Sequence, residues 1–356
     1  TNAQSRAMED ALRKRDIPYR IYGGLSFYQR KEIKDILAYL RILVNPKDEE
    51  SLKRIINYPP RGIGQTTVDK LVVASKHHDL PFFETIVKAK ELQLPLNAGT
   101  LLKLSEFSTL IQRFQIENET LNAFEVTDLV TKKIGLVQEL KKDATPEGIA
   151  RIENIEELLN GIRDFTEGQE ELADANGSLS EFLEDVALAT DLDKDDDPNS
   201  DRVALMTIHL AKGLEFPYVF IVGLEEDLFP SAMSLNTRTE LEEERRLFYV
   251  ALTRAEERAF LSYTLSRYRW GKLIDAEPSR FIEEIDPQYL NKVVPKNDYS
   301  FKPLLNTSIF DEPTPQRQWS NNIKKTPKEK LITTPTSSQL KKLRKIEPTA
   351  TIKSED

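Results

Sequence analysis

The sequence predicts an α/β protein in which one parallel-sheet domain is interrupted by an all-helical insertion. Strand-prone segments occur only toward the two ends of the folded part of the chain, at 19–22, 203–208, 218–222 and 259–263. The stretch between them has apolar residues at helical spacing and no strand pattern. The flanks 1–45 and 200–298 together have the size of one ordinary domain, and a surface loop tolerates a long insertion, so we expect 46–199 to be the insertion.

The first flank is expected to form a helix, a strand and a second helix. A helical stretch at 3–15 precedes the β-prone segment 19–22, and Gly23-Gly24 marks a turn after it. Asn45-Pro46 ends the second helix, in which apolar residues recur three or four positions apart: Ile33, Ile36, Leu37 and Leu40.

The insertion and the second flank differ in their periodicity. Two apolar faces predict two insertion helices, the first formed by Ile152, Ile155, Leu158, Leu159, Ile162 and Phe165 and the second by Leu179, Phe182, Leu183 and Val186. Strands return at 203–208 and 218–222, followed by a charged helix at 240–257 and a strand at 259–263. From 299 to 356 Lys, Pro and Thr are frequent without periodicity, which predicts a disordered tail.

The composition excludes several classes of protein. The chain has 356 residues, 39% hydrophobic and 31% charged, so most of it has enough apolar residues for packed cores. Its longest strongly apolar run, at 219–222, is too short to span a membrane, and no signal-peptide pattern opens the chain. The lack of Cys and the presence of only three His lead us to expect no metal site, and they suit a reducing cytoplasm. Because residue 1 is Thr, we expect the chain to begin within a longer protein.

The net charge is negative but unevenly distributed. A formal charge of −9 argues against a uniformly basic nucleic-acid binder, yet the tail 299–356 is net basic. Acidic residues gather at 167–197. The run at 191–197 lacks the glycine and the distal Glu of a calcium loop, so we interpret it as a solvated loop. DNA binding must therefore be argued from motifs.

The sequence contains no phosphate loop. Its one Gly-Lys pair, Gly271-Lys272, has Ser266 where the first Gly of such a loop belongs, and Leu273 follows in place of Ser or Thr. Without that loop the β- and γ-phosphates of a nucleotide have no cradle. The acids at 225–227 follow an apolar strand as Mg²⁺-binding acids do, but we interpret them as a loop beyond the strand end.

One segment places polar residues where α/β proteins bind ligands. At 203–217 we expect a buried strand that ends in Thr207 and His209, a tight turn through Lys212-Gly213, and then Glu215. Polar groups at the carboxyl end of a strand suit a ligand site. The alternative is a plain strand and turn followed by a capping Glu.

A second segment, 242–255, has the pattern of a helix whose apolar positions place Arg254 near the edge of its buried face. An Arg in that position can reach a phosphate across a domain interface and offset transition-state charge. The alternative is an Arg at a helix end, where the helix dipole favours it.

Several motifs in order along the chain resemble the UvrD/PcrA/Rep family of superfamily 1 DNA helicases. The resemblance covers about 1–287 and rests on 203–217, 242–255 and four shorter motifs: Thr-Asn-Ala-Gln-Ser-Arg at 1–6, Tyr-Arg-Ile-Tyr-Gly-Gly-Leu-Ser-Phe at 19–27, Lys-Glu-Ile-Lys-Asp at 31–35 and Pro-Arg-Gly-Ile-Gly at 60–64. The segment 203–217 is similar to motif V of the family and the segment 242–255 to its motif VI.

The resemblance implies the second of the family's two RecA-like domains, which are of the P-loop NTPase type, with its helical insertion. In the family ATP binds between the two RecA-like domains and single-stranded DNA crosses both. ATP with Mg²⁺ would thus be held mainly by a first domain that this sequence lacks. By motif position Arg254 resembles the arginine finger at the γ-phosphate, and Glu215 the carboxylate at the nucleotide sugar. Thr207 and His209 resemble single-strand contacts, with Lys212 as a weaker one.

The turn at 61–66 resembles the part of the insertion that contacts duplex DNA, through Arg61, Gly62, Gly64 and Thr66. Two glycines without Cβ let backbone N–H groups approach a phosphate, and we expect Thr66 to cap the helix that begins there. Such contacts position DNA without reading its sequence, which a translocating motor requires.

The resemblance therefore predicts the C-terminal half of an ATP-dependent 3′→5′ DNA helicase of DNA repair or replication. We expect this chain alone to be inactive. Its expected partners are single-stranded DNA, junctions of single-stranded and duplex DNA, and repair or replication proteins in the bacterial cytoplasm near the nucleoid. Two alternatives stay open: a stand-alone, non-catalytic DNA-binding or regulatory module, which the missing phosphate loop favours, and a helicase–nuclease fusion, which needs further chain after residue 356. The basic tail is interpreted as a linker, or as the lead into a partner-binding domain.

Overall fold

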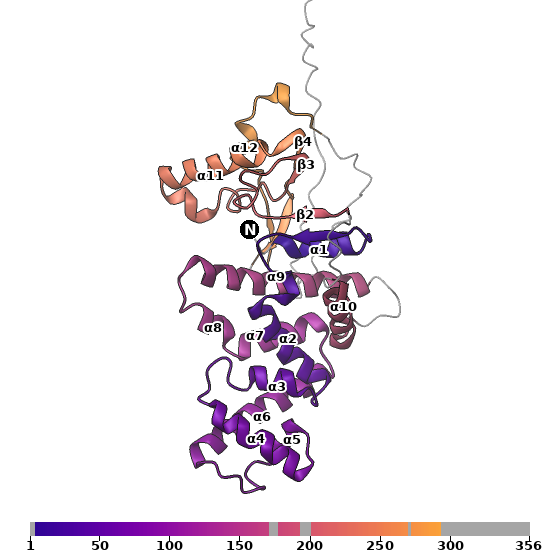
Figure 1. Cartoon of the computed structure of the whole chain (residues 1–356), viewed down its shortest axis with the longest axis vertical. Coiled ribbons are helices and arrows are strands. Elements are labelled where there is room, and N and C mark those ends of the chain that lie inside the picture. The colour runs from indigo at the N-terminus through magenta and orange to yellow at the C-terminus, as the bar shows by residue number, and fades with distance from the viewer. Residues whose placement is uncertain (1–3, 171–176, 193–200, 270–271, 293–356) are drawn as a thin grey trace, which may run out of the picture. The chain divides into compact units, whose positions relative to one another are not determined.

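The computed structural model describes residues 4–170, 177–192, 201–269 and 272–292 (Figure 1). The helix, strand and helix predicted for the first flank are confirmed as α1 (Ser5–Arg13), β1 (Tyr19–Ile21) and α2 (Lys31–Val44). The predicted disordered tail, most of the acidic run at 191–197 and Gly271 lie outside the described residues.

The described residues between α2 and position 201 contain helices and no strand, as predicted for the insertion. The helices are α3 (Glu49–Ile55), α4 (Gln65–His78), α5 (Phe82–Val87), α6 (Ala98–Asn118), α7 (Ala123–Lys133), α8 (Leu136–Leu140), α9 (Pro146–Glu170) and α10 (Leu179–Leu192). Side chains just before three of them accept hydrogen bonds from first-turn N–H groups and so mark where the helices begin: Asp48 for α3, Asn97 for α6 and Asn122 for α7.

In the part of the chain that the structure describes, the strands form two parallel pairs and one hairpin. Figure 1 shows β3 and β4 side by side. β1 pairs with β2 (Val203–Leu205), and β3 (Phe216–Ile221) pairs with β4 (Ala255–Leu261), with α11 (Arg238–Leu252) between them in the chain. β5 (Ser266–Arg269) and β6 (Lys272–Asp275) form an antiparallel hairpin, and the short helix α12 (Arg280–Glu283) follows. The chain thus has the mixed helix and strand content of an α/β protein.

The boundaries of β2, α11 and β4 differ from the prediction. β2 ends at Leu205, where its pairing with β1 stops, and Val203 is 41% exposed, so the expected buried strand to position 208 is wrong. The charged helix ends at Leu252, and β4 begins at Ala255 because its backbone pairs with β3 from that residue onward. Pairing with a strand distant in the chain decided these ends, and local charge and hydropathy do not encode that pairing.

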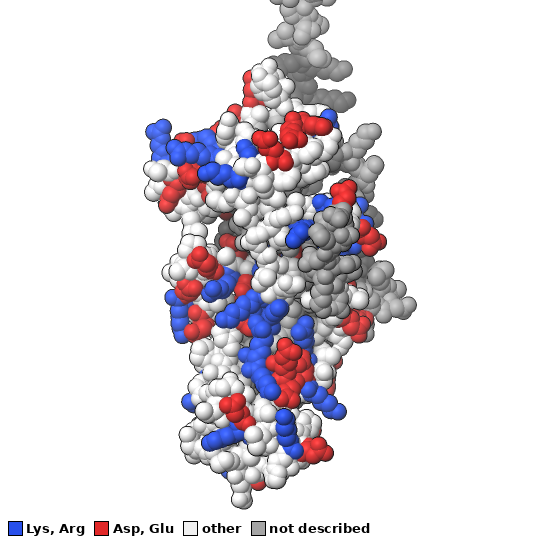
Figure 2. All heavy atoms as spheres, in the orientation of Figure 1, with Lys and Arg blue, Asp and Glu red and all other residues white. Residues whose placement is uncertain are grey.

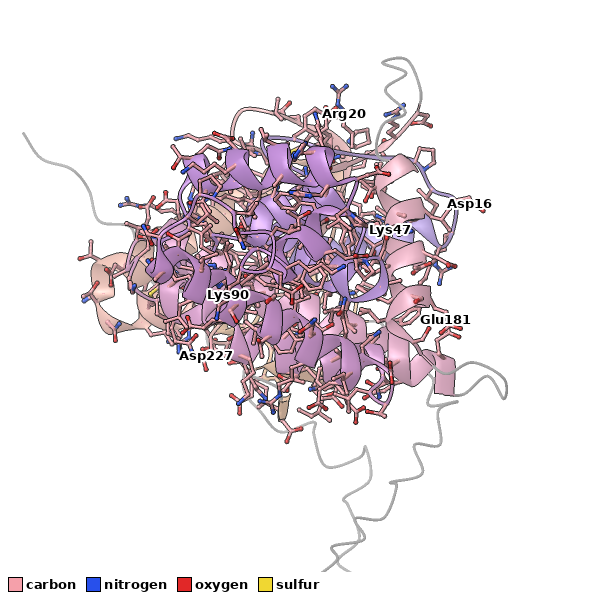
Figure 3. All side chains as sticks on the ribbon, turned by 90° about the horizontal axis from the view of Figure 1, so that it is seen from below. Asp16, Arg20, Lys47, Lys90, Glu181 and Asp227 are labelled. Atoms are coloured by element: carbon pink, nitrogen blue, oxygen red, sulfur yellow. The ribbon has the colours of Figure 1, made fainter. Side chains whose placement is uncertain are left out.

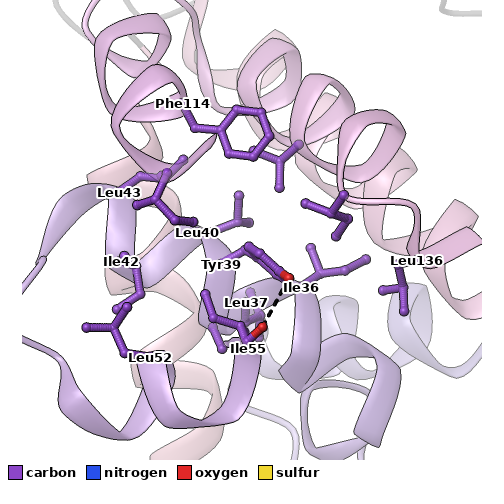
Figure 4. Packing of buried hydrophobic residues seen from close by; sticks show 14 of the residues in the cluster. Ile36, Leu37, Tyr39, Leu40, Ile42, Leu43, Leu52, Ile55, Phe114 and Leu136 are labelled. Atoms are coloured by element: carbon purple, nitrogen blue, oxygen red, sulfur yellow. Dashed lines mark hydrogen bonds between the residues drawn. The ribbon is translucent and has the colours of Figure 1, made fainter. Parts of the chain in front are cut away.

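The larger of two hydrophobic clusters lies among the helices, with α2 in its middle (Figure 4). α2 packs against α3, α6, α9 and α10, and it buries Ile33, Ile36, Leu37, Tyr39, Leu40, Ile42 and Leu43. The predicted apolar faces of α9 and α10 are confirmed by the burial of Ile155, Leu158, Ile162, Leu179, Phe182 and Val186. The domain division proposed above places α2 in the first flank, whereas its buried side chains join the helical core.

The smaller cluster packs α11 and α12 against one face of the β3–β4 pair. Its buried members are Ile221, Leu224, Phe248, Ala251 and Phe281. Alternate residues of β3 point to the other face, where Tyr218 is 56% and Phe220 69% exposed. This cluster holds the end of α11 and the start of β4 against β3, and so positions Arg254 between them.

Charges of both signs are interspersed over the face shown in Figure 2, so the negative net charge does not form one continuous acidic surface there. Exposed charged residues such as Asp16, Arg20 and Glu181 lie on the outside of the end-on view in Figure 3. None of the described helices combines the length and the apolar character needed to cross a bilayer.

Candidate nucleotide- and DNA-binding sites

Arg254 and Glu215 are brought together at the start of the β3–β4 pair. The backbone carbonyl of Arg254 accepts a hydrogen bond of 2.9 Å from the N–H of Phe216, the residue after Glu215. The Arg254 guanidinium donates from Nη1 to the carbonyl of Leu214, the residue before Glu215, at 2.9 Å. Because β3 and β4 run parallel, these contacts place both residues at the amino ends of the strands.

The guanidinium of Arg254 is hydrogen-bonded to uncharged groups. Its Nε donates to the carbonyl of Val250 at 3.0 Å and its Nη2 to Oγ1 of Thr253 at 3.1 Å. Among the described residues no carboxylate forms an ion pair with Arg254, and Glu215 is exposed beside it. A guanidinium that is oriented but not neutralised is well suited to an incoming phosphate.

Thr207, His209 and Lys212 lie on the loop that connects β2 to β3. The carbonyl of Thr207 accepts hydrogen bonds of 3.1 Å from the N–H groups of Leu210 and Ala211, which folds the loop into a tight turn. His209 and Lys212 are exposed and Thr207 is partly exposed. These residues therefore lie beyond the strand in a turn, and the same loop leads directly to Glu215.

The turn before α4 has the expected glycines, but its side chains differ from the prediction. Gly62 has a φ of +70°, which a residue with a Cβ adopts only under strain. Gly64 is the N-cap residue and has no side chain to offer, while Thr66 lies inside the first helical turn and is exposed. The expectation that Thr66 caps α4 is therefore wrong, because a capping side chain must precede the helix.

Two of the acids at 225–227, Glu225 and Glu226, form ion pairs with arginines, and the segment is a loop beyond β3 as interpreted. Glu225, 2% exposed, accepts hydrogen bonds from Arg267 Nε at 2.9 Å and Nη2 at 3.0 Å. Burial raises the pKa of Glu225, but the hydrogen bonds and charge of Arg267 and the hydrogen bonds of Thr264 outweigh it and hold the pKa below its ordinary value. Glu226 pairs with Arg280 at 2.7 Å. No cluster of three potential metal ligands occurs in the part of the chain that the structure describes.

Two residues at the turn before α4, Asn57 and Lys103, were not predicted from the sequence. Asn57 accepts two hydrogen bonds from the backbone of the turn, and Lys103 of α6 donates to the carbonyl of Gly62 at 3.3 Å. Asn57 lies only four residues before Arg61, and Asn side chains often accept hydrogen bonds from nearby turn backbone, so the sequence could have indicated its role. Nothing in the spacing connects Lys103 to the turn, because helix packing brings it there.

Comparison with known proteins identifies the family. The family described as UvrD-like helicase C-terminal domain matches residues 1–266. The ATP-dependent DNA helicase PcrA of Staphylococcus aureus (strain Mu50) is 40% identical over 292 residues, which cover 82% of this chain and 39% of that protein. PcrA of Staphylococcus epidermidis is 37% identical over 331 residues, which cover 92% of this chain and 43% of that protein. The chain spans about two fifths of the length of these curated relatives. It belongs to the UvrD-like helicase C-terminal domain family.

Proposed function

We propose that this chain is the C-terminal part of an ATP-dependent DNA helicase that translocates 3′→5′ on single-stranded DNA and unwinds duplex in DNA repair or replication. The observation that carries the proposal is the placement of Arg254 beside Glu215, with the Arg254 charge unpaired among the described residues. PcrA of Staphylococcus aureus, one of the relatives that the chain matches, is an ATP-dependent DNA helicase.

The residues present fit one side of a nucleotide site. Arg254 would meet the γ-phosphate as an arginine finger, and the Glu215 carboxylate would contact the sugar. The described residues offer no acid cluster for Mg²⁺, and the sequence has no phosphate loop, so ATP and Mg²⁺ would be held mainly by another domain of the whole protein. This chain alone is therefore expected not to hydrolyse ATP.

The loop 206–215 would couple the nucleotide to the single strand. Thr207, His209 and Lys212 would contact the strand, and Glu215 at the end of the same loop would contact the nucleotide. A change in how Arg254 and Glu215 engage the nucleotide would move the loop, because Arg254 donates a hydrogen bond to the carbonyl of Leu214. The exposed Lys212 and the hydroxyl of Thr207 suit backbone contacts, which do not depend on base sequence.

We place the RecA-like domain at 1–45 and 200–298, with the helical insertion at 46–199 between them. The insertion would contact duplex DNA ahead of the single strand through the turn at 61–66. Gly64, the N-cap residue of α4, offers no side chain to the N–H groups of the first turn, and the Thr67 N–H donates to the Gly64 carbonyl at 2.9 Å. The N–H groups of Gln65 and Thr66 would be left to meet a phosphate.

The test measures ATP hydrolysis and DNA binding on the 356-residue chain and on the whole helicase. We expect the chain alone to bind a 3′-tailed duplex without hydrolysing ATP, and the whole protein to hydrolyse ATP when DNA is added. ATP turnover by the chain alone would reveal a phosphate site on it and overturn the proposed division. DNA binding with no hydrolysis by the whole protein would favour the non-catalytic DNA-binding module instead.

A further inference from the structure

The turn before α4 is held from the inside of the protein. The side-chain oxygen of Asn57 accepts hydrogen bonds from the N–H groups of Arg61 and Ile63, both at 3.0 Å. The Ile63 side chain is 1% exposed and belongs to the helical core. The backbone is therefore fixed on both sides of Gly62, whose left-handed φ of +70° turns the chain outward between these two anchors.

The side chain of Arg61 is turned into the protein. Its Nη1 donates to the carbonyl of Ile55 at 2.9 Å and to that of Pro59 at 3.3 Å. Its Nη2 donates to the hydroxyl of Tyr39 at 2.6 Å, and the guanidinium lies 5.3 Å from the ring centre of Phe107. Two of these acceptors, Ile55 and Tyr39, belong to fully buried residues, so the guanidinium is directed into the protein and away from a phosphate outside.

Tyr39 connects this contact to the centre of the helical core. The ring is fully buried, and the hydroxyl donates to the carbonyl of Tyr58 at 2.6 Å (Figure 4 shows its other bond, to Ile55). Burial raises the pKa of Tyr39 to about 12, so the hydroxyl keeps its proton and accepts from Arg61 while it donates to the backbone. Arg61 is therefore anchored to α2 rather than to solvent.

The cation on the outside of the turn is Lys103. Its Nζ lies 3.3 Å from the carbonyl oxygen of Gly62, and the residue is exposed. A Cβ added to Gly62 would lie 2.5 Å from this Nζ, so the glycine leaves the space that the ammonium group occupies. Of the two basic residues at the turn, Arg61 faces inward and Lys103 faces solvent.

We propose that Arg61 and Asn57 are positioning residues that order the turn 62–66 for the DNA backbone, and that Lys103 supplies the positive charge a phosphate meets there. The inference rests on the proposed function, in which this turn contacts duplex DNA. Arg61 then acts through the hydrogen bonds that its two terminal guanidinium nitrogens donate within the protein, and its side chain does not contact the DNA.

The experiment measures fluorescence anisotropy of a labelled 3′-tailed duplex with the 356-residue chain at several salt concentrations. A single strand of the tail sequence is the second probe. Arg61→Lys and Arg61→Ala should each weaken binding to the tailed duplex by about tenfold, because the single ammonium group of Lys cannot replace the two terminal nitrogens of the guanidinium. Both should leave the salt dependence and the binding of the single strand unchanged. Lys103→Ala should reduce the slope of log K against log [salt] by about 0.9, the value for one lost phosphate contact.

Three further variants control for folding and for charge. Asn57→Ala and Gly62→Ala alter the turn without removing a core side chain, and each should weaken binding as Arg61→Ala does. Lys76→Ala, at the opposite end of α4, removes an exposed charge of the same kind and should leave the slope unchanged. Circular dichroism melting of each variant identifies any that is unfolded.

Each outcome assigns a role to the turn. If Arg61→Lys binds like the parent chain while Arg61→Ala lowers the salt slope, Arg61 contacts the phosphate directly and the positioning role is wrong. If Lys103→Ala leaves the slope unchanged, the charge assigned to it is wrong. If neither Gly62→Ala nor Lys103→Ala changes binding to the tailed duplex, the turn does not contact duplex DNA, and that part of the proposed function fails.

Discussion

Gly161 lies in the interior of α9, where helix propensity alone favours alanine. A Gly→Ala change in a helix interior raises stability by about 1 kcal/mol, because glycine has more backbone entropy to lose on folding. At this position, however, an added Cβ would lie 2.6 Å from Nη1 and 2.8 Å from Cζ of Arg6. The guanidinium of Arg6 would have to move to make room for it.

Three carboxylates oppose that movement. Arg6 Nε lies 2.8 Å from Glu157, Nη1 lies 2.9 Å from Asp10, and Nη2 lies 3.2 Å from Asp164. The side chains of Arg6 and Glu157 are 9% and 15% exposed, so this pair is largely buried, whereas Asp164 is 58% exposed and contributes little. Breaking a buried pair costs about 3 kcal/mol or more. After the propensity gain of about 1 kcal/mol, we expect Gly161→Ala to lower the free energy of unfolding by about 2 kcal/mol.

Gly168 provides a matched control in the same helix, since a Cβ there meets no atom within 4 Å. Urea denaturation followed by circular dichroism should show Gly168→Ala stabilising the protein and Gly161→Ala destabilising it. In an Arg6→Ala background Gly161→Ala should also become stabilising, because the Arg6 atoms that approach the added Cβ (Nη1, Cζ and Cδ) are then absent. If Gly161→Ala stabilises the protein while Arg6 is present, the ion cluster does not hold Arg6 in place.

Three other predictions concern the site and the hairpin. On the proposed function, Arg254→Ala in the whole protein should reduce ATP hydrolysis by about 10³-fold with single-strand affinity retained, and normal hydrolysis would refute the finger assignment. Glu225→Gln should lower the free energy of unfolding by about 2 kcal/mol at pH 7. Because the pKa of Glu225 is held low in the fold, the stability that Glu225 contributes is complete above its ordinary pKa of 4.5 and is lost as pH falls through the folded pKa. The unfolding free energies of the variant and the parent should therefore converge in acid. A difference in unfolding free energy that does not change with pH would contradict this. The guanidinium of Arg163 lies 4.3 Å from the ring centre of Phe124 and 4.4 Å from that of Tyr268. Arg163→Lys should lower the free energy of unfolding by about 1 kcal/mol and speed amide hydrogen exchange in β5. Equal exchange in the variant and the parent would show that this stacking does not hold the hairpin.

Sequence patterns were sufficient for the types of the elements and for the family. Apolar spacing identified α2, α9 and α10, because a helix must turn one side to a core whichever core that is. The absence of a phosphate loop from this sequence could also be recognised without a structure, since the glycines and the lysine of such a loop lie within one short segment. The motifs that resemble the helicase family lie in continuous segments and needed no structure to recognise.

Tertiary structure decided which distant residues meet. Periodicity shows that α2 is buried but cannot show that its partners are other helices. Arg61 and Lys103 are both basic residues near one turn, and only packing against Tyr39 turns the first inward and leaves the second outside. The same holds for Arg254 and Glu215, whose proximity depends on the parallel pairing of β3 with β4. Local sequence sets backbone preference and the side of burial, whereas contact across the fold depends on which elements pair and pack.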